Sequence, residues 1–514
     1  MKEGIKTVKS VLKIAALSGI ALMSAMPVHA HPEDEAQLTG HSWQPQGRPP
    51  GAQAKKEEKH VYTNVTLIDA VSDQPKSNMA IVVKGEKITA VVPTSQLTSA
   101  MQKDAEVVDG SGWYVMPGLI ESHGHVGTVP NQSRAEFLLN RQLYAGITTA
   151  RDLAGDVRFL ANLSRQSLIK EIPAPDVKYV ALMAGPKFFV DPRTKSSGRG
   201  VTPGEVSWMQ AVTEDSDMKV AVARSRGTWA TAIKTYANID GKTMKKIGKE
   251  ARKQGIPVWS HVQVGPAHSL DVAKAGVHSM SHACDIPSAV FTDKMNKEFL
   301  KNGGGNPMRD VSLDHPKIAE VFAEMKKHNT VLDPTLSVYA NRKEREKQMR
   351  EMAKKQGISY EEMQKRRRGG RKATSLRAKC DLDKAYKITK MAYDAGIKIV
   401  AGTDAWTPDT AMFPKLHDEI RMLNEGVGMP MMDVLKAATI NGAIAIGQED
   451  EIGSIEEGKF ANLLFLKKNP LNGTDNLKSV VLTVKRGTEY YRKDFVLGSS
   501  GGMGPMMPQS SKKQ

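Results

Sequence analysis

The sequence is poor in cysteine and in aromatic side chains. Only two cysteines, Cys284 and Cys380, occur among 514 residues, and aromatic residues make up 5% of the chain. This cysteine content excludes a small scaffold held together by many disulfides. The sequence alone leaves open whether the two cysteines form a disulfide or remain as thiols.

Long apolar runs are also scarce, and the one near the N-terminus is short. Four lysines precede an apolar run at residues 14–26, and small residues follow at 28–30, where a signal peptidase would cut. The run falls short of the ~20 residues that span a bilayer. These features predict a signal peptide at residues 1–30, and therefore a periplasmic or secreted protein without stable membrane insertion.

Positive charge is in excess, and much of the excess is local. The net charge is +17, and residues 341–372 hold thirteen Lys or Arg against five Glu. Such a block can be a solvated helical face, a flexible insertion or a surface that binds anions. Tyr360 is its only aromatic residue, whereas nucleic-acid surfaces interleave aromatics for base stacking, so we expect no nucleic-acid partner.

Short β-rich runs occur on both sides of the middle of the chain, at residues 60–68, 80–83, 88–92, 452–466 and 480–491. They predict two parts of one β-sandwich domain, 60–112 and 446–496, built from segments far apart in the sequence. A leader at 31–59, rich in Pro, Gly, Gln and charge, is predicted to be flexible, and a Gly-, Ser- and Met-rich tail at 497–514 is predicted to be disordered.

The middle of the chain, residues 113–445, alternates between strand and helix patterns. Strands are predicted at 114–122, 147–151, 177–182, 230–235, 257–261, 277–282, 330–336 and 397–402. Helices are predicted between them, for example at 241–254, and a last helix at 432–446 ends the series. This order predicts a (β/α)8 TIM barrel. A doubly wound open sheet is the alternative, but no Gly-rich dinucleotide loop follows an early strand.

Residues able to bind a metal stand where these strands end. They are His123 and His125 on the first strand, Lys234 on the fourth, His261 on the fifth, His282 on the sixth and Asp404 on the eighth. Residues i and i+2 of a strand face the same side, and barrel strands bring their carboxyl ends to one mouth. Each residue alone has an ordinary alternative, such as a core histidine or a helix cap. Their joint placement predicts a metal site.

Lys234 is the exception in this set, because an ammonium group cannot coordinate a cation. A lysine carboxylated by carbon dioxide would be an anionic ligand able to bridge two metals. The alternative is an interior lysine that pairs with a carboxylate.

Several motifs in the same order resemble the amidohydrolase superfamily, in particular its imidazolonepropionase-like and prolidase-like branch. They are Pro117-Gly118-Leu119-Ile120 with His123-Gly124-His125, residues 146–153, 232–237, 275–282, 402–404, 437–443 and 453–459. The resemblance extends over residues 65–466 and implies two divalent ions, with zinc expected. His123, His125 and Asp404 would hold one ion, His261 and His282 the other, and carboxylated Lys234 would bridge them.

Four residues depart from the pattern of this family: Glu121, Gln263, Ser281 and Asn462. Glu121 replaces a usual aspartate and Asn462 a common one, and both changes should be tolerable. Gln263 and Ser281 lie next to predicted ligands, so they are expected to change the hydrogen bonding around the site and with it the substrate preference.

The resemblance implies a hydrolase that cleaves an amide bond in a dipeptide or an N-acyl amino acid, using a metal-activated water. Asp404 would act as the general base, and Tyr236, which shares a strand face with Lys234, would stabilise the oxyanion unless its hydroxyl is only structural. Lys187, Arg193 and Arg199 are candidates for binding a substrate carboxylate. Alternatives are hydrolysis of a cyclic amide, lactone or organophosphate, or binding of envelope lipids or anionic polymers through residues 341–372. A homo-oligomer is compatible with the sequence.

Overall fold

The computed structural model describes residues 58–291, 311–368 and 380–498. The predicted signal peptide, and almost all of the predicted leader and tail, lie outside these residues. Within the described part of the chain, no helix is both long enough and apolar enough to cross a membrane.

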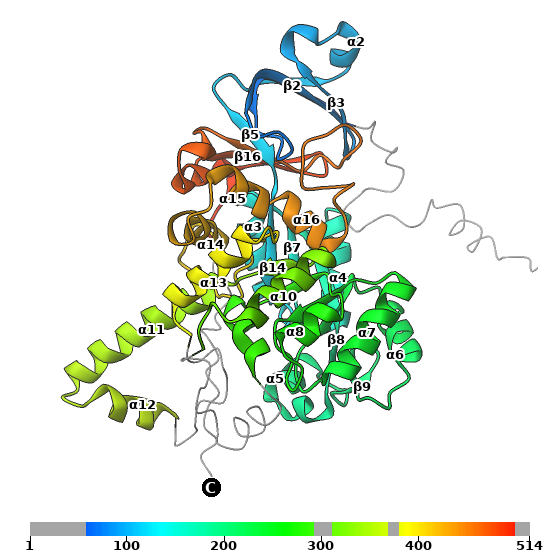
Figure 1. The fold of residues 1–514 in the computed structure, drawn as a ribbon. Coiled ribbons are helices and arrows are strands. Elements are labelled where there is room, and N and C mark those ends of the chain that lie inside the picture. Colours follow the sequence, from blue (N-terminus) through cyan, green and yellow to red (C-terminus); the bar gives the residue numbers. More distant parts are fainter. Residues whose placement is uncertain (1–57, 292–310, 369–379, 499–514) are drawn as a thin grey trace, which may run out of the picture. The chain divides into compact units, whose positions relative to one another are not determined.

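Seven parallel strands form most of a barrel (Figure 1). In spatial order they are β6 (Leu119–Gly124), β7 (Ile147–Asp152), β8 (Asp176–Ala184), β11 (Ala232–Thr235), β12 (Val258–His261), β13 (Ser279–Ser281) and β14 (Val331–Asp333). Six of the first seven predicted strands are therefore confirmed, and four of these six are shorter than predicted. The first, predicted at 114–122, is two strands: β6 belongs to the barrel, whereas Tyr114–Pro117 pairs in a second sheet, so the β domain extends beyond the predicted boundary at 112. The short strands β9 (Glu205–Val206) and β10 (Met209–Ala211) lie in the connection after β8, and β10 pairs with β8.

The eighth position of the barrel holds an irregular segment in place of the predicted regular strand at 397–402. Among the described residues, its one ladder contact is an isolated bridge between Leu332 and Ile399. Backbone hydrogen bonds join it to the first strand: Ser122 N donates to Ala401 O at 2.9 Å, and Asp404 N donates to His123 O at 2.9 Å. The fold is thus a (β/α)8 barrel that closes through a segment whose amides bond outside a regular ladder.

Helices surround the barrel and connect its strands. The main ones are α3 (Gln132–Tyr144), α4 (Val157–Leu168), α6 (Met218–Arg226), α7 (Gly241–Gln254), α8 (Ser269–Lys274), α10 (Pro316–Lys327), α13 (Leu382–Asp394) and α14 (Leu416–Arg421). In α7, the Asp240 side chain accepts a hydrogen bond from Thr243 N and caps the first turn. Met244, Ile247 and Ala251 repeat at helical spacing and bury one face against the core, so the prediction for 241–254 is confirmed.

The predicted helix at 432–446 is two helices, α15 (Met431–Ala437) and α16 (Ile440–Ile446). The break follows from competition for backbone carbonyls. Ala401 N donates to Ala437 O at 3.1 Å, and Ile120 N donates to Ala438 O at 2.8 Å. These carbonyls therefore bond to barrel amides, and Thr439 between the two helices has φ −135° and ψ −96°, outside helical values.

A second, eight-stranded sheet combines segments from before and after the barrel. Its strands are β1 (Lys59–Leu67), β2 (Lys76–Lys84), β3 (Lys87–Pro93), β4 (Glu106–Asp109), β5 (Tyr114–Pro117), β15 (Leu463–Leu466), β16 (Val480–Lys485) and β17 (Thr488–Tyr491). β5 pairs antiparallel with β15, and Met116 lies opposite Leu464. The predicted pairing of distant segments in one β domain is confirmed. The strand predicted at 452–466 is reduced to β15, because Gly453 and Gly458 have positive φ and form turns.

Cys284 and Cys380 form a disulfide, which answers the question that the sequence leaves open. Cys284 lies two residues after His282, in the short helix η3 (Ala283–Val290), and Cys380 lies just before α13. The bond therefore joins the loop after β13 to the segment that follows the basic block.

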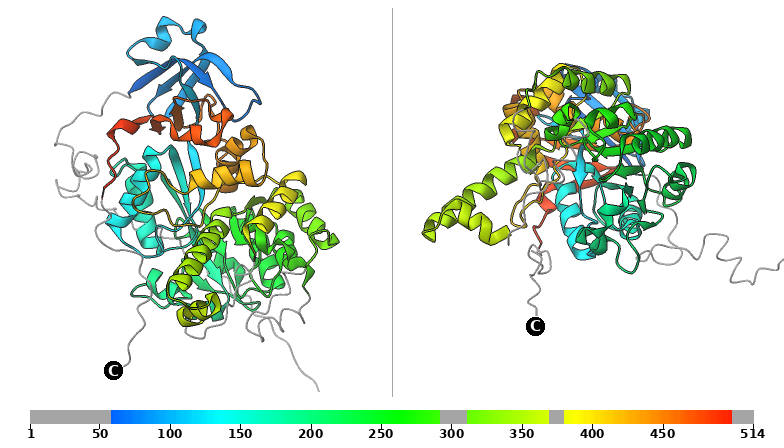
Figure 2. Two further views of the ribbon diagram at one scale, coloured as in Figure 1. Left: turned by 90° about the vertical axis from the view of Figure 1, so that its left-hand side faces the viewer. Right: turned by 60° about the horizontal axis from the view of Figure 1, so that its bottom comes forward.

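The described part of the basic block is helical and belongs to α11 (Leu336–Lys355) and α12 (Tyr360–Arg368), which we call the arm. Figures 1 and 2 show these helices standing out from the other barrel helices. Glu419 on α14 anchors the first turn of α11 by accepting hydrogen bonds from Leu336 N at 2.8 Å and Ser337 N at 2.7 Å. Burial raises the pKa of Glu419 to about 8.

Candidate metal centre and active site

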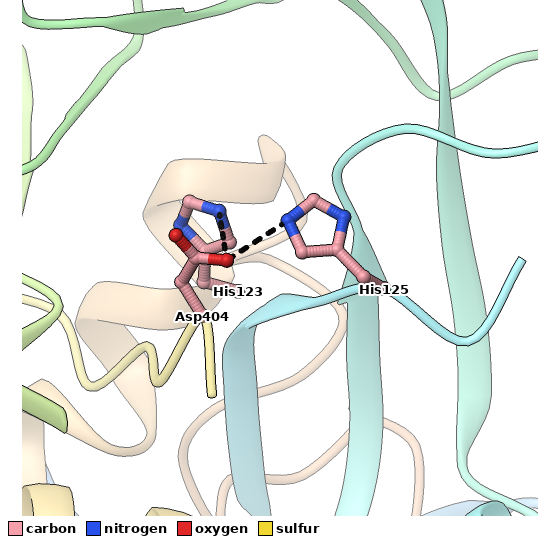
Figure 3. Close-up of side chains that lie close together, drawn as sticks. All are labelled: His123, His125 and Asp404. Atoms are coloured by element: carbon pink, nitrogen blue, oxygen red, sulfur yellow. Dashed lines mark ion pairs between the residues drawn. The ribbon is translucent and has the colours of Figure 1, made fainter. Parts of the chain in front are cut away.

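Three predicted ligands meet at the carboxyl end of β6. One donor atom each of His123, His125 and Asp404 lies within 4.8 Å of the other two (Figure 3). Asp404 Oδ1 is 3.1 Å from His125 Nε2 and 3.9 Å from His123 Nε2, and its Oδ2 is 3.9 Å from His282 Nε2. Three imidazole nitrogens therefore converge on one carboxylate, which is a donor set suited to zinc-like ions.

Hydrogen bonds on the far side of two rings direct their Nε2 atoms toward this cluster. His123 Nδ1 lies 2.6 Å from Asp333 Oδ2, and His282 Nδ1 lies 2.8 Å from Thr335 Oγ1. His123 and Asp333 are fully buried, so the carboxylate fixes a proton on Nδ1 and leaves Nε2 as the donor to a cation.

Asp333 is a positioning residue that the sequence analysis missed. The strand predicted at 330–336 contained it without a role, although an acid beside Leu332 in an apolar strand is an available signal. Ser281, one of the four departures from the family pattern, donates from Oγ to Asp333 Oδ2 at 2.9 Å. Ser281 therefore helps to hold the carboxylate that orients His123.

The backbone around the cluster is unusual where the ligands change direction. Asp404 has φ 43° and His282 has φ 82°, both in the left-handed region that side chains rarely adopt. Gly402 is packed so tightly that an added Cβ would collide with the carboxylate of Asp333 and lie 2.9 Å from His123 Cβ. Only glycine fits at this approach of the closing segment to β6.

Glu121 ties the first strand to the closing segment. It accepts hydrogen bonds from His123 N at 2.9 Å, Thr403 N at 3.0 Å and Thr403 Oγ1 at 3.0 Å. Burial raises the pKa of Glu121 to about 8, although these hydrogen bonds oppose the shift. Glu121, which replaces the aspartate usual in this family, therefore has a structural role beside the ligands.

The two histidines of the first strand have different electrostatic surroundings. Burial lowers the pKa of His123, although the negative charges of Asp333 and Asp404 act to raise it. Burial also acts to lower the pKa of His125, but the hydrogen bond to Asp404 and the charges of Asp404 and Asp152 outweigh it and raise the pKa. The neutral form of His123, which a metal requires, is therefore favoured before any ion binds.

The other three predicted ligands surround this group. The ring centroid of His261 lies 4.7 Å from that of His282, which in turn lies 5.3 Å from His123. Lys234 is fully buried on β11, and its charge acts on both His123 and His125. All six predicted residues thus gather at one end of the barrel, and three of them form the compact donor group.

Tyr236 lies beside His261, with ring centroids 4.2 Å apart, and its hydroxyl accepts a hydrogen bond from Arg193 Nη1 at 3.2 Å. Arg193, on α5 (Pro192–Ser197), is held by Asp191 through an Nη2–Oδ2 contact of 2.7 Å. Lys187 and Arg199, the other two basic candidates, are exposed, and they are not among the described residues that line the cavity next to the cluster.

This cavity has a volume of about 690 Å³ and contains His125, Tyr236, His261 and Asp404 in its wall. Its apolar lining includes Val126, Leu138, Leu182, Phe188, Met209 and Trp406, and its cationic lining consists of Arg134, Arg193 and Arg345. A mostly apolar cavity of this size, with a few polar groups at one end, suits a small molecule.

Replacing Asp333 with Asn is expected to weaken zinc binding by about 10–100-fold, because the amide keeps the size but loses the charge that orients His123 and makes it more basic. Competition with a chromophoric chelator measures the affinity without any substrate. Ser281→Ala, which removes only a hydrogen bond to Asp333, should cost less. Equal zinc affinity in Asp333→Asn and the unmodified protein would show that this carboxylate does not support the site.

Comparisons with known proteins agree with this architecture. A model of the amidohydrolase family matches residues 114–490. The 5-methylthioadenosine/S-adenosylhomocysteine deaminase of Thermoanaerobacter pseudethanolicus is 23% identical in an alignment 429 residues long, which covers 78% of this chain and 84% of that protein.

Two solved structures share the fold at low sequence identity. A Xaa-Pro dipeptidase with bound methionine aligns with a TM-score of 0.60 and 21% identity, covering 84% of this chain and 100% of that one. The ochratoxinase of A. niger aligns with a TM-score of 0.61 and 19% identity, covering 85% of this chain and 96% of that one. At these identities the likeness establishes the shared fold, and function must be argued from the site.

Proposed function

The chain belongs to the amidohydrolase family and is a hydrolase of carbon–nitrogen bonds, and from this premise we propose that it cleaves an amide bond in a dipeptide or an N-acyl amino acid. The observation that carries the proposal is the convergence of His123, His125 and His282 Nε2 on Asp404 beside a cavity for a small molecule. The apolar lining supports a substrate with a hydrophobic side chain or acyl group, and the arginines support an acidic one.

The residues present fit a pair of divalent ions, with zinc as the proposed metal. His123, His125 and Asp404 would hold one ion, His261 and His282 the second, and a carboxylated Lys234 would lie between them. Bound there, the ions would supply Lewis-acid polarisation of the carbonyl and lower the pKa of water. The buried position of Lys234 beside two ligands supports its modification, because a nearby ammonium would repel the ions.

The side chains around the cavity have separate roles in the proposed reaction. Asp404 takes the proton of the attacking water and returns it to the leaving amine. Tyr236, held by Arg193, donates its hydroxyl hydrogen to the developing oxyanion, and the position of its ring beside His261 supports this role. Arg193 therefore orients Tyr236 and contributes positive charge at the same end of the cavity.

We also propose a periplasmic or secreted location. The lysine-rich start and the short apolar run support it. The disulfide between Cys284 and Cys380 adds independent support, because such bonds persist in oxidising compartments.

A substrate panel tests the proposed reaction. Protein purified with zinc and bicarbonate is assayed on dipeptides, N-acyl amino acids, cyclic amides, lactones, organophosphates and 5-methylthioadenosine. We expect hydrolysis of dipeptides or N-acyl amino acids that disappears after chelation and returns with zinc. Deamination of the adenosine compound alone, or hydrolysis that survives chelation, would contradict the proposal. So would salt-sensitive binding of an anionic polymer without any hydrolysis.

A further inference from the structure

The wall of the cavity beside the cluster carries more positively charged side chains than negatively charged ones. Arg134, Arg193 and Arg345 line it, and Asp404 is the only acid among the described lining residues. In the proposed site Asp404 is already engaged with the histidines at the metal end. The rest of the wall is cationic or apolar.

Two of the three arginines are committed to carboxylates of the protein. Arg134 Nη2 lies 2.6 Å from Asp409 Oδ1, and its guanidinium stacks on Trp406 at 4.1 Å. Arg193 pairs with Asp191 and also holds Tyr236. These two groups therefore shape the wall, and their charge is partly neutralised.

Arg345 differs from both. It lies on α11 in the arm, and no carboxylate of the described residues comes within ion-pairing distance of it. The helix offers it no acid either, because the positions three and four residues away are Asn341, Arg342, Gln348 and Met349. The neighbouring Glu346 is paired with Arg350 at 2.8 Å. Arg345 thus reaches the cavity with its charge uncompensated.

We propose that Arg345 is a specificity-determining residue that binds a carboxylate of the substrate, so that the arm contributes a wall of the binding site. The inference rests on the proposed function and adds the substrate class: a compound with a free carboxylate and an apolar side chain or acyl group. The planar guanidinium can form two parallel hydrogen bonds to a carboxylate. Phe188, Leu138 and Trp406 provide the apolar part of the wall.

The test compares the best dipeptide or N-acyl amino acid with its C-terminal amide, which lacks the negative charge. For the free acid, Arg345→Ala should raise KM and lower kcat/KM by about tenfold, the effect of one partly exposed charge-assisted contact. kcat should change little, and kcat/KM for the amide should be the same in both proteins. Arg345→Lys should keep part of the preference for the acid.

Lys347→Ala is the matched control. It removes one positive charge from the same helix two residues away, a spacing that places it on a different face, and Lys347 is exposed and is not among the described lining residues. Its kinetics should equal those of the unmodified protein. Equal losses on acid and amide in Arg345→Ala, or equal losses in the two variants, would overturn the proposal.

Binding separates failure of this inference from failure of the proposed function. If no panel member is hydrolysed, the proposed reaction is wrong, and calorimetry with N-acetyl-phenylalanine and its amide still tests Arg345. Tighter binding of the acid, lost in Arg345→Ala and kept in Lys347→Ala, supports the carboxylate site. Equal binding of acid and amide by the unmodified protein overturns it.

Discussion

Asp404→Asn is expected to lower kcat by about 10²–10⁴-fold while leaving the zinc content near normal. The carboxylate oxygens lie 3.1 Å from His125 Nε2 and 3.9 Å from both His123 and His282 Nε2. An asparagine keeps one oxygen to face an ion, but it cannot accept a proton from water at neutral pH. Steady-state kinetics and elemental analysis of the same preparation measure the two effects.

The matched control for this variant is Asp394→Asn. It makes the same chemical change at an exposed acid of α13 that pairs with Lys390, and it should leave turnover unchanged. Retained turnover in Asp404→Asn would refute its role as the base. If Asp404→Asn loses both zinc and turnover, the result would support only a role for Asp404 as a metal ligand.

Lys234→Ala is expected to lower the metal-to-protein ratio and with it the activity. The side chain is fully buried on β11, and its charge acts on His123 and His125. An ammonium there opposes a cation, whereas a carboxylated lysine attracts one. Elemental analysis gives the ratio, and Lys234→Met, which keeps a similar length but has no amine to carboxylate, should behave in the same way.

The modification has a readout that is independent of turnover. Protein prepared with isotopically labelled bicarbonate should carry the label, and Lys234→Ala should not. Adding a short carboxylic acid to Lys234→Ala should restore part of the metal binding. An unchanged metal ratio in Lys234→Ala, or equal labelling of both proteins, would refute the bridging role.

Much of the barrel was predictable because its strands are apolar and end in polar residues. Seven of the eight barrel strands form within or close to their predicted ranges, although Tyr114–Pro117, the first half of the first prediction, pairs in the second sheet. The helix at 241–254 has both an acidic cap and a buried face. The cluster of His123, His125 and Asp404 followed from a geometric rule, since barrel strands bring their carboxyl ends together.

The elements that differ from prediction are those decided by contacts between distant residues. Ala437 and Ala438 have helical neighbours, but their carbonyls bond to Ala401 and Ile120, so the helix breaks there. The closing segment at 397–402 has a strand-like sequence but bonds to Ser122 of β6 outside a regular ladder. Local sequence propensity predicts neither the helix break nor the irregular closing segment, because the hydrogen-bond partners that decide them lie far away in the chain.

The support of the ligands was the least predictable part of the site. Asp333 lies 210 positions after His123 in the sequence, and only the folded barrel brings its carboxylate to 2.6 Å from the ring. The same holds for Arg345, which the sequence shows as one residue of a basic block and the structure shows in the cavity wall. Charge patterning locates such a block but does not tell which member faces a substrate.

The central claim is that the convergence of His123, His125 and His282 on Asp404 forms a metal centre. Anomalous diffraction at the zinc absorption edge, from crystals of zinc-loaded protein, tests it most directly. We predict a peak among the Nε2 atoms of these histidines and the Asp404 carboxylate, with a second peak beside His261 and Lys234. Zinc-loaded crystals without a peak at this cluster, or with their peaks elsewhere on the chain, would contradict the claim.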